Sequence, residues 1–254
     1  MATRRSMVGR KSARTTTERP RRPAAWPTSR RSAPPKKRGP AGPPLLGLIL
    51  IPVAVTLGVT LLRLGGELME WSPRYFSRVA GGGLAVVGIT WLVPIVGFYL
   101  GYRLGRAGVG PSSLARAAGL PLAALVLAPA LAWLGSRLES ASTATGLITV
   151  WAVASVIAAI LAFAAWPRLG AVLVTYAFAA RVPVAGIMWL AIQRNWGTHY
   201  DAPPPGFPAM TPDSRWLWTG LLPQMTIWVS GTVMVGALFG ALGWLAASRR
   251  TGAG

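Results

Sequence analysis

Residues 169–192 read LGAVLVTYAFAARVPVAGIMWLAI, an apolar stretch of 24 residues in which Arg181 is the only charged side chain. A helix rises about 1.5 Å per residue, so roughly 20 such residues cross the ~30 Å hydrocarbon core of a bilayer. The stretch therefore predicts a membrane-spanning helix that carries a cation near its centre.

Five other windows share this apolar character, and together the six predict an all-α, polytopic membrane protein built as a six-helix transmembrane bundle. The composition agrees, because 52% of the 254 residues are hydrophobic and only 13% are charged, a balance typical of proteins that face lipid. The predicted spans are approximately 44–62, 79–102, 117–135, 145–166, 169–192 and 222–247, with an outer loop at 193–221 and a C-terminal tail at 248–254.

The N-terminal segment, residues 1–43, is rich in Arg and Pro and holds 13 Lys and Arg residues against the single acid Glu18. It has almost no large apolar side chains, so burial could not offset the entropy lost on ordering, and we expect a disordered tail. Its charge favours anionic lipid beside the first span. Nucleic acid is not expected as a partner, because Trp26 is the only aromatic residue among these basic residues.

The basic residues also predict an orientation. If the N-terminus lies in the cytoplasm and the six spans alternate, 19 Lys and Arg residues fall inside and 6 fall outside. This positive-inside bias predicts that both termini are cytoplasmic. Arg outnumbers Lys 23 to 3, which is typical of a bacterial chain from a GC-rich genome, so the expected location is the bacterial cytoplasmic (inner) membrane.

Glycines recur every four residues in two of the predicted spans. The second span ends with Gly97, Gly101 and Gly105, and the sixth contains Gly236 and Gly240. This spacing places small residues on one helical face, where another backbone can approach closely. We expect these faces to pack within the bundle, with homo-oligomerisation or a membrane partner as the alternative.

Arg181 is the one charged side chain that the predicted spans place deep in the bilayer, since none of them contains Asp or Glu. Its burial costs about 2.5–3.5 kcal/mol on insertion scales, so polar compensation is expected. The span centres place four candidates at similar depth: Thr90, Trp91, Ser155 and Thr232. Arg181 either pins helices together, partly through a cation–π contact with Trp91, or lines a wet cavity and binds an anionic substrate or lipid headgroup.

The outer loop contains His199, the only histidine, two residues from Asp201. In extended backbone these two side chains share a face, which makes them a candidate acid–base pair. The alternative is that both groups only cap and order the loop. Because the chain has one His and no Cys, neither a metal site nor a cofactor is expected.

The end of the same loop carries a helix-start signal. Thr211, Pro212 and Asp213 match an N-cap, a Pro at the first helical position and an acid in the first turn. We expect a short helix from about Pro212 that breaks at Pro223, ahead of the sixth span.

No motif in the sequence indicates a particular reaction. The prediction is therefore a non-enzymatic structural or accessory membrane bundle, and two alternatives stay open. One is a small permease or lipid-handling protein that binds an anionic group at Arg181. The other is a membrane enzyme that uses His199 and Asp201 at the outer face.

Overall fold

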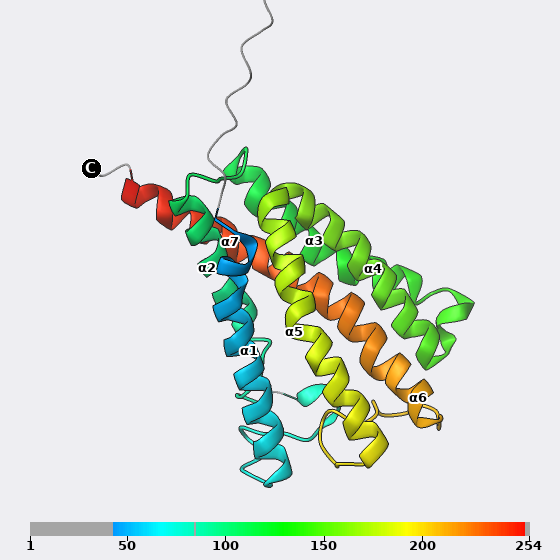
Figure 1. Cartoon of the computed structure of the whole chain (residues 1–254). Helices are drawn as coiled ribbons and strands as arrows, with labels where there is room; N and C mark the ends of the chain where they lie inside the picture. Colours follow the sequence, from blue (N-terminus) through cyan, green and yellow to red (C-terminus); the bar gives the residue numbers. More distant parts are fainter. Residues whose placement is uncertain (1–42, 84, 252–254) are drawn as a thin grey trace, which may run out of the picture. The chain divides into compact units, whose positions relative to one another are not determined.

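The computed structural model describes residues 43–83 and 85–251. Apart from Pro43, the predicted disordered tail lies outside these residues, as do the last three residues of the predicted C-terminal tail. Every regular element in the described part of the chain is a helix (Figure 1). The all-α prediction is confirmed.

Five helices are long and apolar enough to span a membrane, which is the length and composition of a multi-pass membrane protein. They are α1 (Leu45–Leu68), α3 (Leu114–Gly135), α4 (Ala144–Ala165), α5 (Pro167–Arg194) and a continuous helix over Pro212–Arg250. We call the last one the C-terminal helix; it comprises α6 (Pro212–Arg215), the π-helical segments η3 (Trp216–Leu221) and η4 (Gln224–Trp228), and α7 (Val229–Thr251). A further short helix, η2 (Glu139–Ser142), joins α3 to α4.

The structure does not reproduce the six-span count, because the second predicted span is only partly helical. Its helix, α2 (Leu92–Arg106), has 15 residues and is about 22 Å long, shorter than the hydrocarbon core. Residues 79–83 and 85–91 form only the short η1 (Ala80–Gly82) and irregular backbone. Gly81, Gly82 and Gly83 take positive φ angles of 69°, 82° and 55°, and this backbone cannot continue an α-helix.

Helix α1 is longer than predicted and carries charge into a span. The prediction ended the first span at residue 62, whereas α1 runs to Leu68 and includes Arg63 and Glu67. Glu67 is fully buried, so the expectation that no span contains an acid is wrong. The physical reason is that the two residues are one helical turn apart and form an ion pair, which offsets part of the burial cost.

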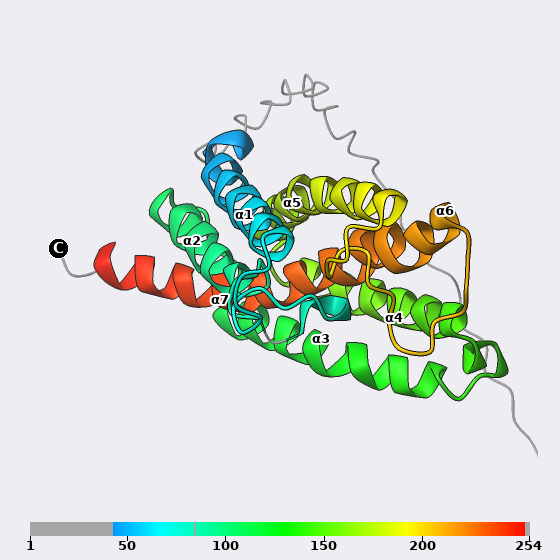
Figure 2. The same ribbon diagram turned by 90° about the horizontal axis from the view of Figure 1, so that it is seen from below.

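The C-terminal helix is the centre of the bundle. It runs between α5 on one side and the antiparallel pair α3 and α4 on the other (Figures 1 and 2). Helix α2 packs along α7 more extensively than any other pair of helices in the described chain. Small side chains permit this arrangement, since much of the core consists of alanine.

The predicted glycine faces meet each other inside the bundle. A Cβ atom on Gly97 would lie 2.5 Å from the carbonyl oxygen of Gly236, and one on Gly101 would collide with the backbone of Gly240. Gly105 faces Ala247 one turn further on. We call the contact formed by these five glycines the glycine seam; at Gly97 and Gly101 it is a contact of backbone on backbone that only glycine allows at this distance.

The C-terminal helix begins where the sequence predicts, but it does not break at Pro223. The Thr211 hydroxyl accepts a hydrogen bond from the backbone N–H of Ser214 at 3.4 Å, and Pro212 is the first helical residue. Pro223 keeps helical angles, with φ −61° and ψ −41°, between η3 and η4. The predicted break is wrong, because the wider hydrogen-bonding of π-helical turns accommodates a residue that lacks an N–H.

Candidate functional site

Two loops meet at the end of the bundle where α1 and α5 finish, which we call the loop end. One loop follows α1 and is described over residues 69–83 and 85–91, and the other is residues 195–211, after α5. The backbone N–H of His199 donates to Glu67 Oε2 at 2.8 Å, joining positions 132 residues apart in the chain. The buried acid at the end of α1 therefore positions the second loop.

Glu67 is also the centre of a charged network. Arg63 Nε donates to Glu67 Oε1 at 2.8 Å, and Arg63 Nη2 donates to the carbonyl oxygens of Ser77 at 3.1 Å and Gly82 at 2.9 Å. Arg78 donates to the backbone carbonyl of Glu67, with Nε at 2.9 Å. These charge-assisted hydrogen bonds hold the irregular loop against the end of α1.

The ring of His199 is held by the same carboxylate. Its Nδ1 lies 2.6 Å from Glu67 Oε1. Burial lowers the pKa of His199 and the nearby charge of Arg63 lowers it further, while the hydrogen bond to Glu67 raises it. The net direction is downward, so the ring is neutral near pH 7 and Nδ1 carries the proton that it donates to Glu67.

The carboxylate of Asp201 is hydrogen-bonded within its own loop. Its carboxylate accepts hydrogen bonds from the backbone N–H groups of Gly197 at 2.9 Å and Thr198 at 2.7 Å. The Thr198 hydroxyl donates to it as well, at 2.7 Å. Asp201 thus orders the loop, and the structure brings the ring of His199 to Glu67 instead.

Tyr200 fixes the loop from the opposite side of His199. Its phenol donates to the backbone carbonyl of Thr60 in α1 at 3.3 Å, and its ring centre lies 3.9 Å from that of His199. Burial raises the pKa of Tyr200, so the phenol stays protonated and can act as this donor. The His199 ring is therefore restrained by both a carboxylate and an aromatic neighbour.

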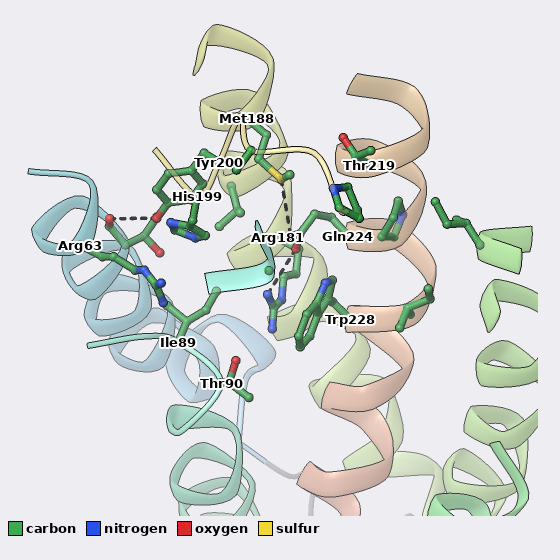
Figure 3. Close-up of a pocket in the computed structure, with 18 residues that line it drawn as sticks. Arg63, Ile89, Thr90, Arg181, Met188, His199, Tyr200, Thr219, Gln224 and Trp228 are labelled. Carbon is green, nitrogen blue, oxygen red and sulfur yellow. Dashed lines mark hydrogen bonds between the residues drawn. The ribbon is translucent and has the colours of Figure 1, made fainter. Parts of the chain in front are cut away.

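A pocket of about 300 Å³ opens beside these residues, between α1, the two loops, the N-terminal part of α4, α5 and the C-terminal helix. This volume is at the lower end of the range of small-molecule sites. Aliphatic side chains form part of its wall, and the polar residues in it are Thr60, Arg63, Thr90, Arg181, His199, Tyr200, Thr219 and Gln224. Figure 3 shows Arg63 and His199 on one side, and Arg181, Gln224 and Trp228 on the other.

Arg181 is the charge that stands out in this pocket. It is 5% exposed, its Nη1 donates to Gln224 Oε1 at 3.3 Å, and its guanidinium lies 5.0 Å from the centre of the Trp228 ring. Gln224 Nε2 donates to the sulfur of Met188 at 3.6 Å, which fixes the orientation of the amide. Among the described residues Arg181 has no carboxylate partner, whereas Arg63 is paired with Glu67.

Of the four residues predicted to surround Arg181, the structure brings one into the same pocket. Thr90 lines it, whereas Trp91 is 64% exposed, and the ring over the guanidinium belongs to Trp228. The predicted depth of residues 90 and 91 assumed a complete second span, but both residues lie ahead of α2.

The other two predicted residues are buried away from the pocket wall. Ser155 of α4 is 3% exposed and is not among the lining residues. The hydroxyl of Thr232 donates to the backbone carbonyl of Trp228 at 2.8 Å within its own helix. A hydroxyl at the same membrane depth as Arg181 therefore need not point toward it, because depth does not determine how a helix is rotated about its axis.

Sequence reasoning missed several residues of the site: Arg63, Glu67, Tyr200, Gln224 and Trp228. One local signal was available, since Arg63 and Glu67 are four residues apart directly after the first apolar run. Gln224 and Trp228 gave no such signal, because their contact with Arg181 depends on how the C-terminal helix is rotated.

The donors and acceptors of the site suit an oxyanion better than a cation. No group of three His, Cys, Asp or Glu residues in the described ranges is placed to hold a metal ion. Arg181 and Gln224 present N–H donors to the pocket, whose charged lining residues are arginines. Comparison with known protein families, curated proteins and solved structures finds no match to this chain.

Proposed function

We propose that this membrane protein binds an anionic group at Arg181 in the loop-end pocket, as a small permease or a lipid-handling protein. The observation that carries the proposal is a nine-tenths buried guanidinium that lines a pocket and has no carboxylate partner among the described residues. A phosphate or carboxylate oxygen of the ligand would supply the missing negative charge.

The free energy of burying Arg181 supports a role in ligand binding rather than in holding helices together. Placing this cation in a span costs about 2.5–3.5 kcal/mol. Its contacts with Gln224 and Trp228 return roughly 1–2 kcal/mol, as a hydrogen bond and a cation–π contact do in other proteins. A purely structural pin would be improved by an apolar side chain, and a structural or accessory bundle remains the alternative if no anion binds.

Binding to the purified protein in detergent tests this proposal. Inorganic phosphate and dihexanoyl phosphatidic acid are the probes, because they carry the same phosphate chemistry with and without acyl chains. We expect one or both to raise the unfolding temperature, by the equivalent of about 2.7 kcal/mol at 100 times Kd. A response to phosphate supports a permease, and a response to the lipid alone supports lipid handling.

The matched variants are Arg181→Lys, which keeps the charge but loses the planar fork, and Arg181→Gln, which loses both. We expect Lys to weaken binding at least tenfold and Gln to abolish it, while both proteins still fold. Unchanged binding in Arg181→Gln, or no binding of either probe to the wild type, contradicts the proposal.

Water access to the pocket is a second test, since the chain has no cysteine. A cysteine at Met188, which lines the pocket, is expected to react with a small water-soluble thiol reagent and to be protected by the bound anion. The control is Val182→Cys on the outer, 56% exposed surface of α5, which should face lipid and react slowly. Equal reactivity at the two positions would argue against a wet pocket.

The orientation and partners are also proposals. In a bacterial cytoplasmic membrane, the positive-inside rule would place both termini in the cytoplasm and the loop end outside. Two observations support this sidedness: Gly105 near the end of α2 faces Ala247 of α7, and Arg168 at the start of α5 lies 3.4 Å from Pro43. The basic tail would contact anionic lipid, and a homo-oligomer or membrane partner would use outer helix faces.

A further inference from the structure

The geometry around His199 resembles that of a histidine prepared for proton transfer. Glu67 Oε1 lies 2.6 Å from Nδ1, and Glu67 Oε2 accepts from the backbone N–H of the same residue. Two contacts to one fully buried carboxylate fix both the rotation and the tautomer of the ring. Nε2 is left as the proton-free nitrogen, and it has no hydrogen-bond partner among the described residues.

The ring of His199 and the guanidinium of Arg181 belong to the same pocket. Both line it, from opposite sides, and the ring of Tyr200 packs against the imidazole (Figure 3). An anion bound by Arg181 would therefore fill the space that the imidazole faces. The remaining pocket charge, Arg63, is already committed to Glu67 and to two backbone carbonyls.

We propose that His199 and Glu67 form an acid–base dyad that moves a proton to or from the anion bound at Arg181. This rests on the proposed function, and it assigns the pocket an activity on an oxyanion that carries a hydroxyl or holds a water molecule beside it. His199 Nε2 uses its lone pair to take the proton of that O–H group, and the bonding electrons stay on the oxygen. The imidazolium that forms is stabilised by Glu67, and Nε2 then returns the same proton to an oxygen of the bound anion, so that O–H bonds are the only bonds broken and formed.

The alternative carboxylate is excluded by its own contacts. Asp201 is engaged by the loop backbone and the Thr198 hydroxyl, so Glu67 is the group that orients the ring. Burying Glu67 in a span would be costly if it served only to fix a loop, because an apolar contact could hold the same loop without a charge. In this dyad Glu67 is a positioning residue, and His199 is the residue that would touch the substrate.

The sole histidine makes the dyad directly observable. In protein labelled with ¹⁵N-histidine, the wild type is expected to show one imidazole with the proton on Nδ1 and a bare Nε2 at neutral pH. Finding the proton on Nε2 would overturn the proposal without any variant. This measurement needs no substrate and does not depend on a mutant that folds.

Chemical reactivity supplies the second test. Diethyl pyrocarbonate modifies the bare nitrogen of neutral imidazole, and modification of His199 is followed by mass spectrometry of the native protein. We expect Glu67→Gln to slow the reaction about tenfold, because the hydrogen bond and the charge of this carboxylate raise the pKa of His199 and make the imidazole more nucleophilic. The matched control is Glu70→Gln, on an exposed acid, which is expected to react as the wild type does.

Protection by the anion links the dyad to Arg181. Phosphate or dihexanoyl phosphatidic acid, whichever binds, should slow modification of His199 at least tenfold in the wild type and leave Arg181→Gln unprotected. Binding that Arg181→Gln abolishes, combined with an unprotected His199, overturns the dyad and leaves the proposed function standing. Failure of either anion to bind the wild type overturns both, and an unreactive His199 in the native protein overturns the dyad alone.

Discussion

The glycine seam and the loop-end pocket hold the same bundle together by opposite means. In the seam, Gly97 and Gly101 bring the backbones of α2 and α7 into van der Waals contact. At the loop end, buried charges on Glu67, Arg63 and Arg181 take part in hydrogen bonds and ion pairs. Small residues are sufficient to join helices in lipid. Buried charges, which cost free energy, therefore indicate the part of the molecule that has a function other than helix packing.

The largest expected effect is the loss of the buried acid. Glu67→Ala leaves Arg63 buried without its counter-charge and should destabilise the protein by about 3–5 kcal/mol. Thermal or denaturant unfolding in detergent measures this change. Glu70→Ala is the control, since that carboxylate is 78% exposed and its loss should stay within about 0.5 kcal/mol. Equal stability of the two variants would show that the buried ion pair at Glu67 contributes no more to stability than an exposed one.

A single methyl group should disturb the seam. Gly101→Ala places a Cβ against the backbone of Gly240, which cannot move aside as a side chain would, so we expect a loss of about 1–3 kcal/mol. Gly58→Ala is the matched change on α1, where nothing lies within 4 Å of the new methyl group, and it should stabilise by up to about 1 kcal/mol. The same unfolding assay compares them, and a tolerated Gly101→Ala would show that the seam is loose.

Removing the cation of Arg181, which has no carboxylate partner among the described residues, should increase the stability of the protein. Arg181→Met replaces a buried guanidinium with an apolar side chain of similar length, and it should raise stability by about 1–2 kcal/mol while abolishing anion binding. The melting temperature and the binding assay are measured on the same preparation. A destabilised variant would instead identify Arg181 as a structural pin, as in the alternative interpretation.

The smallest expected effect is a pH dependence. Because burial lowers the pKa of His199, the folded protein favours the neutral ring; stability is then full above the unfolded pKa of about 6.5 and falls as the pH drops through the lower folded value. The slope from one proton cannot exceed about 1.4 kcal/mol per pH unit.

Melting temperatures between pH 8 and pH 4, compared with His199→Asn, isolate this contribution from the other charged groups that face the ring. Those groups are Glu67 and Arg63 of α1, together with Tyr200 and Asp201 of the same loop. An identical pH profile in the two proteins would show that His199 does not titrate in this range.

Much of the architecture follows from the sequence, because helix formation and burial in lipid depend on local composition. The apolar windows over α3, α4 and α5 end within three residues of the observed helices. The second window was misleading, since Gly81 to Gly83 read as small apolar residues although their positive φ angles are incompatible with an α-helix. Hydropathy measures transfer to lipid and is insensitive to backbone conformation.

The candidate site could be predicted only in part. Arg181 and His199 stand out by their rarity, and the structure places both in one pocket. Their partners Glu67 and Trp228 could not be found in the same way, because each contact joins segments that are distant in the chain. The spacing of His199 and Asp201 suggested that they pair, but the carboxylate of Asp201 accepts its hydrogen bonds from the backbone of its own loop.

The C-terminal helix contains two π-helical segments between its start and the glycine seam. Each π turn adds a residue to the hydrogen-bonded ring, so it shifts the angular phase of everything that follows. The face that offers Gln224 to Arg181 is thereby decoupled from the face that presses Gly236 against Gly97. Substitutions around Gln224 could therefore change ligand preference during evolution, while the packing of Gly236 against α2 stays the same.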